Sequence, residues 1–157
     1  MTTTVTTPGR VTIRRATRAD LLSIHRIEKQ SFPQPWPYRA FVGFLSEPGF
    51  LVASDAGVVG YAVADTVPNH GRAIGHLKDL AVDPDRRGEG IGSRLLDRVL
   101  GTLAAQGVAR VKLEVRESND RARSLYRRFG FERHHTVPRY YDDTEDALVL
   151  VTDVTER

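Results

Sequence analysis

The sequence of 157 residues contains no cysteine, which excludes disulfides, thiolate metal sites and a cysteine nucleophile. It also lacks any stretch close to the roughly 20 consecutive apolar residues that a transmembrane helix needs, so we expect no membrane partner. The threonine-rich residues 1–10 lack the apolar segment of a secretory signal, and we expect them to form a disordered lead-in to one domain at residues 11–157. These absences favour a cytoplasmic protein.

Lysine is scarce as well, because it occurs only at positions 29, 78 and 112, and nearly all positive charge is therefore arginine. Arginine suits bidentate recognition of phosphate or carboxylate, although a bias in genomic base composition would give the same excess. The net charge of +3 fits an anionic small molecule but is too small to indicate a nucleic-acid partner. With 40% hydrophobic and 27% charged residues, the chain has the composition of a globular domain with a real core.

The most informative stretch is a glycine-rich turn between two apolar segments. Residues 77–82 read as a buried strand, and apolar residues recur at helical spacing over residues 91–103. Between them, Gly88, Gly90 and Gly92 lack the Cβ atoms that would block a ligand from the backbone. Consecutive backbone N–H groups would then point outward at the positive end of a helix, which predicts a phosphate-binding site.

The spacing of this turn excludes two common phosphate-binding motifs. No Gly-Lys-Ser/Thr closes it, so it is not a P-loop. Five polar residues follow Val82, and Ser93 occupies the place of the third glycine of a dinucleotide-binding fingerprint. What remains is an arginine at position 87 with glycines at 90 and 92. By itself this short pattern also fits an exposed glycine turn that binds nothing.

The hydrophobic pattern predicts a mixed α/β sheet with helices on both faces and the element order β-α-α-β-β-β-α-β-α-β-β. Strands are expected at residues 11–15, 50–54, 58–64, 77–82, 111–115, 131–137 and 147–151. Helices are expected at residues 17–32, 38–46, 91–106 and 118–130. Residues 32–38 break the first helix with three prolines among three aromatic residues. This segment is either a stiff connector or a rigid wall of a substrate groove.

A second motif lies downstream of the glycine turn. It consists of Leu-Glu-Val-Arg-Glu-Ser-Asn at residues 113–119, Ser-Leu-Tyr at 124–126 and Phe-Gly-Phe at 129–131. Together with the glycine turn, it resembles the signature of the GNAT N-acetyltransferases, in particular the ribosomal-protein-alanine N-acetyltransferases (the RimI branch) and related protein N-terminal acetyltransferases. The resemblance runs from about residue 80 to residue 151. It implies the GNAT fold and transfer of an acetyl group from acetyl-CoA to the N-terminal α-amine of a protein, with a ribosomal protein as the candidate substrate.

The resemblance also implies roles for individual residues. Glu114 matches the general base of the family and Tyr126 its general acid. Leu80, Ala81 and Val82 match the strand that pairs with the pantetheine arm, and Asn119 matches a further CoA contact. The pyrophosphate loop would consist of Arg87, Gly88, Glu89, Gly90, Ile91, Gly92 and Ser93. The substrate-side residues would be Tyr140 and Tyr141, opposite Phe32, Pro33 and Trp36. No metal is implied.

Several of these residues have plainer interpretations. Glu114 would also fit a strand face, paired with Lys112 or Arg116; Tyr126 would fit a core aromatic position, and Asn119 a helix N-cap. Two other functions stay open: a GNAT enzyme that acetylates a small-molecule amine or a lysine side chain, and a CoA-binding or RNA-associated module without turnover. An α-amine titrates near pH 7.8 and lysine near 10.4, so freeing lysine costs about 3.5 kcal/mol more at neutral pH, which favours an α-amine acceptor.

Overall fold

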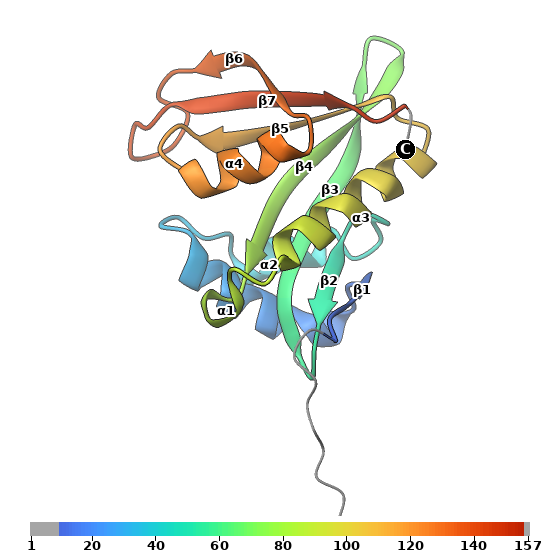
Figure 1. Ribbon diagram of the computed structural model, residues 1–157, viewed down its shortest axis with the longest axis vertical. Helices are drawn as coiled ribbons and strands as arrows, with labels where there is room; N and C mark the ends of the chain where they lie inside the picture. Colours follow the sequence, from blue (N-terminus) through green and yellow to red (C-terminus); the bar gives the residue numbers. More distant parts are fainter. Residues whose placement is uncertain (1–9, 156–157) are drawn as a thin grey trace, which may run out of the picture.

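The computed structural model describes residues 10–155 (Figure 1), so the predicted lead-in lies outside the described residues except for Arg10. Its centre is a seven-stranded sheet in the order β1-β2-β3-β4-β5-β7-β6. Neighbouring strands are antiparallel except β4 and β5, which are parallel. The strands are β1 (Thr12–Arg15), β2 (Leu51–Ser54), β3 (Val58–Asn69), β4 (Arg72–Val82), β5 (Arg110–Arg116), β6 (Glu132–Val137) and β7 (Ala147–Asp153).

Helices cover both faces of this sheet, as predicted (Figure 1). Two lie on one face, α1 (Leu21–Ser31) and α2 (Tyr38–Val42), and two on the other, α3 (Ile91–Ala105) and α4 (Asp120–Arg128). The predicted order of helices and strands is confirmed. The predicted boundaries are less accurate: residues 18–20 form a 3-10 turn before α1, α2 is shorter than residues 38–46, and β3 and β4 continue further along their hairpin, up to Asn69 and from Arg72.

Each face of the sheet has its own core. Against α3 and α4 the core consists of aliphatic side chains, because α3 buries Ile91, Leu95, Leu96, Val99, Leu100 and Leu103 at helical spacing. Against α1 and α2 it is richer in aromatic residues, and Phe41, Phe50 and Tyr61 are almost completely buried there. The edge of Tyr61 packs on the ring of Phe41 with the ring centroids 5.7 Å apart.

The sheet is interrupted in its middle. Strand β4 pairs with β3 over its whole length, but it pairs with β5 only through residues 75–77, opposite residues 111–113. Beyond Leu77 and Leu113 the two strands diverge, as Figure 1 shows. Strand β4 is also irregular there, because Val63 pairs with Asp79 and Ala64 with Leu77, which leaves Lys78 without a partner in β3. The divergence leaves backbone groups of β4 unpaired on its β5 side.

No helix in the described part of the chain combines the length and the hydropathy needed to cross a membrane.

Candidate active site

The glycine turn leads from the end of β4 into α3. Residues 84–86 form a 3-10 turn that is capped by Asp83, whose carboxylate accepts the backbone N–H of Asp85 at 3.0 Å. Gly88 and Gly90 both adopt left-handed backbone conformations, with φ of 83° and 79°, and a Cβ at either position would meet open space. Gly90 is the N-cap of α3 and provides no side chain to cap it. The first N–H groups of α3 are therefore available to a ligand.

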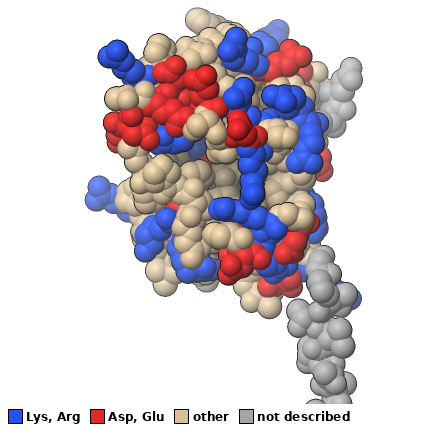
Figure 2. Space-filling view, turned by 60° about the vertical axis from the view of Figure 1, so that its left-hand side comes forward, with Lys and Arg blue, Asp and Glu red and all other residues tan. Residues whose placement is uncertain are grey.

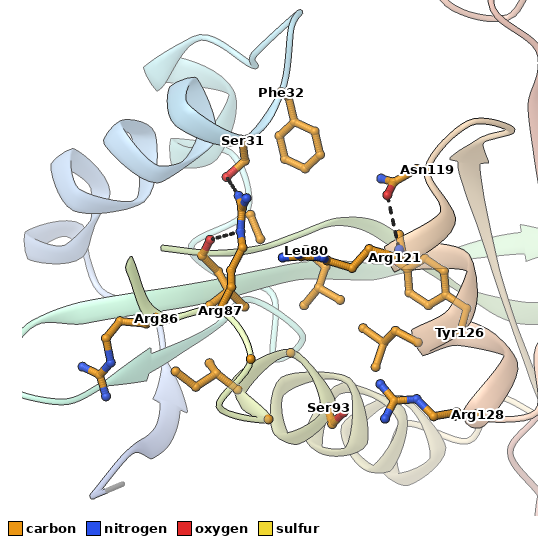
Figure 3. Close-up of a pocket in the computed structure, with 18 residues that line it drawn as sticks. Ser31, Phe32, Leu80, Arg86, Arg87, Ser93, Asn119, Arg121, Tyr126 and Arg128 are labelled. Atoms are coloured by element: carbon orange, nitrogen blue, oxygen red, sulfur yellow. Dashed lines mark hydrogen bonds between the residues drawn. The ribbon is translucent and has the colours of Figure 1, made fainter. Parts of the chain in front are cut away.

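A cavity of about 580 Å³ lies at this turn, bordered by the end of β4, the start of α3 and α4 (Figure 3). Ten of the eleven residues predicted to bind the cofactor line it: Leu80, Ala81, Val82, Arg87, Gly88, Gly90, Ile91, Gly92, Ser93 and Asn119. The eleventh, Glu89, is not among the residues that line this cavity; its carboxylate pairs with the guanidinium of Arg86 at 3.0 Å. Of all the predicted cofactor contacts, the side chain of Glu89 is thus the one that the structure does not place at the cavity.

Arginines surround this cavity on several sides. Arg87 is oriented by hydrogen bonds to the carbonyl oxygen of Val82 (3.4 Å) and to the hydroxyl of Ser31 (3.3 Å), both visible in Figure 3. Arg121 and Arg128 extend from α4 on the other side (Figure 3) and line the cavity as well. These two could not be selected beforehand, since α4 carries several arginines and only the fold shows which of them face the cavity.

A second cavity, of about 180 Å³, adjoins the first where β4 and β5 diverge. It is bordered by the segment between α1 and α2, by both diverging strands and by Tyr141. Five residues line both cavities: Phe32, Leu80, Asn119, Ala122 and Tyr126. The space-filling view shows this face of the molecule hollowed, with acidic side chains gathered above the hollow (Figure 2). The two cavities therefore meet around Tyr126.

Glu114 lies in the second cavity, on the face of β5 away from the aliphatic core. Its Oε1 is 2.6 Å from Nε2 of His76 on β4, and its Oε2 is 3.8 Å from the Lys112 ammonium. Burial favours the neutral acid, but the hydrogen bond from His76 and the charges of His76, Lys112 and Lys78 outweigh it and lower the pKa of Glu114. The carboxylate is thus ionised throughout the neutral range. Arg116, the other expected partner, is not bonded to it.

Tyr126 is both a core residue and a cavity residue. Only 8% of it is exposed, and its ring packs edge-on against Phe131 with the ring centroids 5.6 Å apart. Burial is the main reason why the pKa of its hydroxyl lies far above the ordinary value, and the charges of Asp79 and Tyr141 act in the same direction. The hydroxyl therefore keeps its proton at neutral pH and has a proton to donate.

Asn119 also combines both interpretations. Its side-chain oxygen accepts the backbone N–H of Ala122 at 3.2 Å and so caps α4, while the residue lines both cavities.

The predicted substrate-side residues are brought together with one exception. Phe32, Pro33, Trp36 and Tyr141 line the second cavity. Trp36 is fixed there by a stacked contact with Phe44, with ring centroids 5.8 Å apart. Tyr140 does not line the cavity: it is 50% exposed and packs edge-on against Tyr141. Its position next to Tyr141 in a turn directs the two rings differently, and the sequence does not show which one faces inward.

Arg116 connects the two loops that border the second cavity. Its guanidinium donates to Gln34 (3.3 Å) in the segment between α1 and α2, and to Asp143 (2.7 Å) and Glu145 (3.0 Å) in the segment before β7. It also lies 4.1 Å from the centre of the Tyr141 ring. Burial raises the pKa of Tyr141 to about 12, so its hydroxyl keeps its proton at neutral pH and Arg116 contacts an uncharged ring.

Two pairs of titratable residues lie outside the set of predicted site residues. Glu28 and Asp79 line the second cavity and were missed by the sequence patterns, because Glu28 occupies an apolar face of α1 and Asp79 an apolar strand. The exposed pair His134 and His135 has Nδ1 atoms 2.7 Å apart on β6. Within residues 10–155, no three histidine, aspartate or glutamate side chains gather in a way that would hold a metal ion.

Comparison with known proteins gives consistent matches over most of the chain. Residues 19–131 match the family described as the acetyltransferase (GNAT) family. The chain is 40% identical over 136 residues to the N-alpha-acetyltransferase RimI of Mycobacterium tuberculosis, a match covering 83% of this chain and 84% of that protein. It is 30% identical over 149 residues to the ribosomal protein bS18-alanine N-acetyltransferase of Escherichia coli, covering 92% and 98%. The crystal structure of Ard1 from Thermoplasma volcanium superimposes with a TM-score of 0.86 at 31% identity, covering 93% of this chain and 99% of that one.

Proposed function

The chain belongs to the acetyltransferase (GNAT) family, and we propose that it transfers the acetyl group of acetyl-CoA to the N-terminal α-amine of a protein, as a cytoplasmic enzyme of the ribosomal-protein-alanine type. The observation that carries this proposal is the junction of two cavities at Tyr126. The first cavity is lined by the start of a helix and by arginines, which suit an anionic cofactor, and the second contains an ionised carboxylate.

Acetyl-CoA fits the first cavity by its chemistry. The backbone N–H groups of residues 88–93 would hold the pyrophosphate, and Arg121 and Arg128 add positive charge for phosphate groups. The backbone of residues 80–82 is not paired with β5, and those of its groups that are not bonded to Asp79 or Arg87 could bond the amides of the pantetheine arm. The acetyl end would then lie near Tyr126, where the second cavity begins.

Two side chains would carry the proton transfers. Glu114 is ionised, and His76 holds it in one orientation, so it would accept a proton from the incoming ammonium directly or through a water molecule. Tyr126 keeps its proton because it is buried, and it would donate that proton to the leaving thiolate. The two residues lie on β5 and on the helix that follows it, and both line the second cavity.

The acceptor site suits the end of a chain. The loops on either side are joined through Arg116 to Gln34 and to Glu145, so the groove is bounded on both sides. A bounded groove admits a chain terminus more readily than a lysine within a folded surface. The names of the relatives in Mycobacterium tuberculosis and Escherichia coli also specify N-terminal or alanine acceptors. For this chain, a ribosomal protein is the proposed substrate.

A peptide library tests the proposal. The enzyme and acetyl-CoA are incubated with peptides of random sequence that have free N-termini, and mass spectrometry locates any added acetyl group. A matched library with blocked N-termini and free lysines serves as the control. We expect acetylation of α-amines in the first library and little in the second. Acetylation of lysines alone, or of small amines but of neither library, would contradict the proposed acceptor.

A further inference from the structure

Two buried carboxyl groups and a tyrosine hydroxyl meet in the wall of the second cavity. Glu28, of which only 2% is exposed, accepts hydrogen bonds from the hydroxyl of Tyr61 (2.5 Å) and from the backbone N–H of Trp36 (2.8 Å). One oxygen of Asp79 lies 3.5 Å from the same hydroxyl, and the other accepts the N–H of Leu80 at 2.9 Å. Both carboxyl groups line the cavity that contains Glu114.

The hydroxyl of Tyr61 brings the two carboxyl groups to one point in the cavity wall. Burial raises the pKa of Asp79 well above its ordinary value, and the hydrogen bond and charge of Glu28 raise it further. Asp79 therefore holds its proton more firmly than an exposed aspartate would.

Neither of these carboxyl groups has a cation beside it in the described chain. Among residues 10–155, no lysine, arginine or histidine forms an ion pair with Glu28 or Asp79. The nearby Lys78 pairs instead with Asp65 at 3.8 Å. Glu114, in the same cavity, is matched by His76 and Lys112. A buried carboxyl group without a cation partner ionises at a high cost, and this cost falls where a ligand brings the opposite charge.

We propose that the Glu28–Asp79 pair binds the α-ammonium group of the incoming peptide and positions its nitrogen in the second cavity beside Glu114. This inference rests on the proposed N-terminal acetyltransferase function. The placement fits the fold, because Asp79 immediately precedes Leu80, which lines both cavities. The remaining groups that face the pair are neutral donors: the hydroxyl of Tyr61, the N–H groups of Trp36 and Leu80, and the protonated Tyr126.

Binding measurements test this role separately from turnover. The library peptide that binds most tightly to the complex of the enzyme with CoA is compared with an analogue that lacks only the α-amino group. Calorimetry at pH 6.5 keeps the α-amine ionised, because its usual pKa is near 7.8. Charged hydrogen bonds have typical strengths that correspond to about a ten- to hundredfold preference for the peptide with the amine.

Amide variants distinguish this role from a structural one. Glu28→Gln and Asp79→Asn each leave one carboxylate, so each should keep most of the preference for the amine. The double variant has no charge at this site and should lose the preference while still binding CoA. Asp65→Asn removes a carboxylate that already has a cation partner, and it should keep the preference.

Three results would overturn the proposal: no preference in the wild type, an unchanged preference in the double variant, or an equal loss of both peptides in that variant. If the double variant does not fold, Glu114→Gln decides: a preference that survives the loss of this carboxylate supports the pair, and a preference that disappears with it overturns the proposal. If the wild type shows the preference but acetylates no peptide, the proposed function fails and this inference stands. If the wild type acetylates the peptide but the double variant keeps the preference, the proposed function stands and this inference fails.

Discussion

Nε2 of His76 lies 2.6 Å from Oε1 of Glu114, across the short parallel pairing of β4 and β5 and directly before these strands diverge. This contact fixes the proposed base at the edge of the opening. The contact also favours the ionised form of Glu114, because the hydrogen bond and charge of His76 lower the pKa of its carboxyl group.

Replacing His76 by phenylalanine should therefore change the pH profile as well as the rate. Without its hydrogen-bond donor, Glu114 should have a higher pKa, since burial then acts with less opposition. The acid limb of kcat/KM should move to higher pH, and the plateau should fall by about tenfold. Initial rates from pH 5 to 9 measure both. An acid limb at the wild-type position would show that His76 does not act through Glu114.

Glu114→Gln should lower kcat by about 10²- to 10⁴-fold, because the proposed proton acceptor is lost. The activity should recover partly at high pH, where the peptide amine is already neutral. Affinity for acetyl-CoA should change little, because Glu114 lines only the second cavity. Near wild-type rates from pH 6 to 9 would reduce Glu114 to a residue of the strand face.

Tyr126→Phe should lower kcat to a similar extent, but without recovery at high pH. Its proton is proposed to go to the thiolate and not to the amine, so deprotonating the amine cannot replace it. The phenylalanine ring should preserve the packing against Phe131, and hence the melting temperature. Recovery of this variant at alkaline pH would assign the hydroxyl a different role.

Gly90→Val should abolish the rise in melting temperature that acetyl-CoA produces in the wild type by binding the folded state. A valine at φ 79° is strained, and its side chain would stand at the start of α3, where the pyrophosphate is proposed to bind. Gly107→Val is the matched control, because Gly107 has φ 90°, equally open surroundings and a position beyond the other end of α3. The control should be destabilised but should still respond to acetyl-CoA. Equal responses of the two variants would contradict the assignment of the loop.

Asp20→Asn should destabilise the protein at neutral pH by about 1–3 kcal/mol. The carboxylate of Asp20 accepts two hydrogen bonds from the guanidinium of Arg14 and one from the backbone N–H of Thr17. The hydrogen bond from Arg14 is the main reason why the pKa of Asp20 is lowered, although burial opposes it. A lowered pKa stabilises the folded state above the unfolded pKa near 3.9, and this stabilisation disappears as the pH falls through the folded value. Denaturant unfolding should thus show the difference at pH 7 and a smaller one near pH 3. Asp153→Asn removes an exposed pair with Arg110 and should cost much less.

The parts of the site that lie close together in the chain could be predicted from the sequence. The glycine turn and the apolar spacing of α3 are local patterns, and the positions of Arg87 and Gly90 at the first cavity followed from them together with the family resemblance. Contacts between distant strands could not be predicted. His76 and Glu114 are 38 residues apart, and their contact depends on a register that no single strand reveals.

Buried polar groups were missed for a related reason. Glu28 lies on the face of α1 that also buries Ile24 and Ile27, where the helical pattern predicts apolar residues. Its partners come from β3 and from the loop after α1, so only the assembled fold shows that a carboxylate is satisfied there. The orientations of the Tyr140 and Glu89 side chains could not be predicted either, since both residues lie in turns whose geometry the residue types do not determine.

The parting of β4 from β5 beyond Leu77 has a consequence for the order of catalytic events. It leaves two joined cavities at this point, so that a donor held in the first and an acceptor held in the second would meet without competing for one cavity. An enzyme that stores the acetyl group on itself needs one entrance that its substrates use in turn. Two joined cavities suit a sequential mechanism, in which both substrates are bound at once.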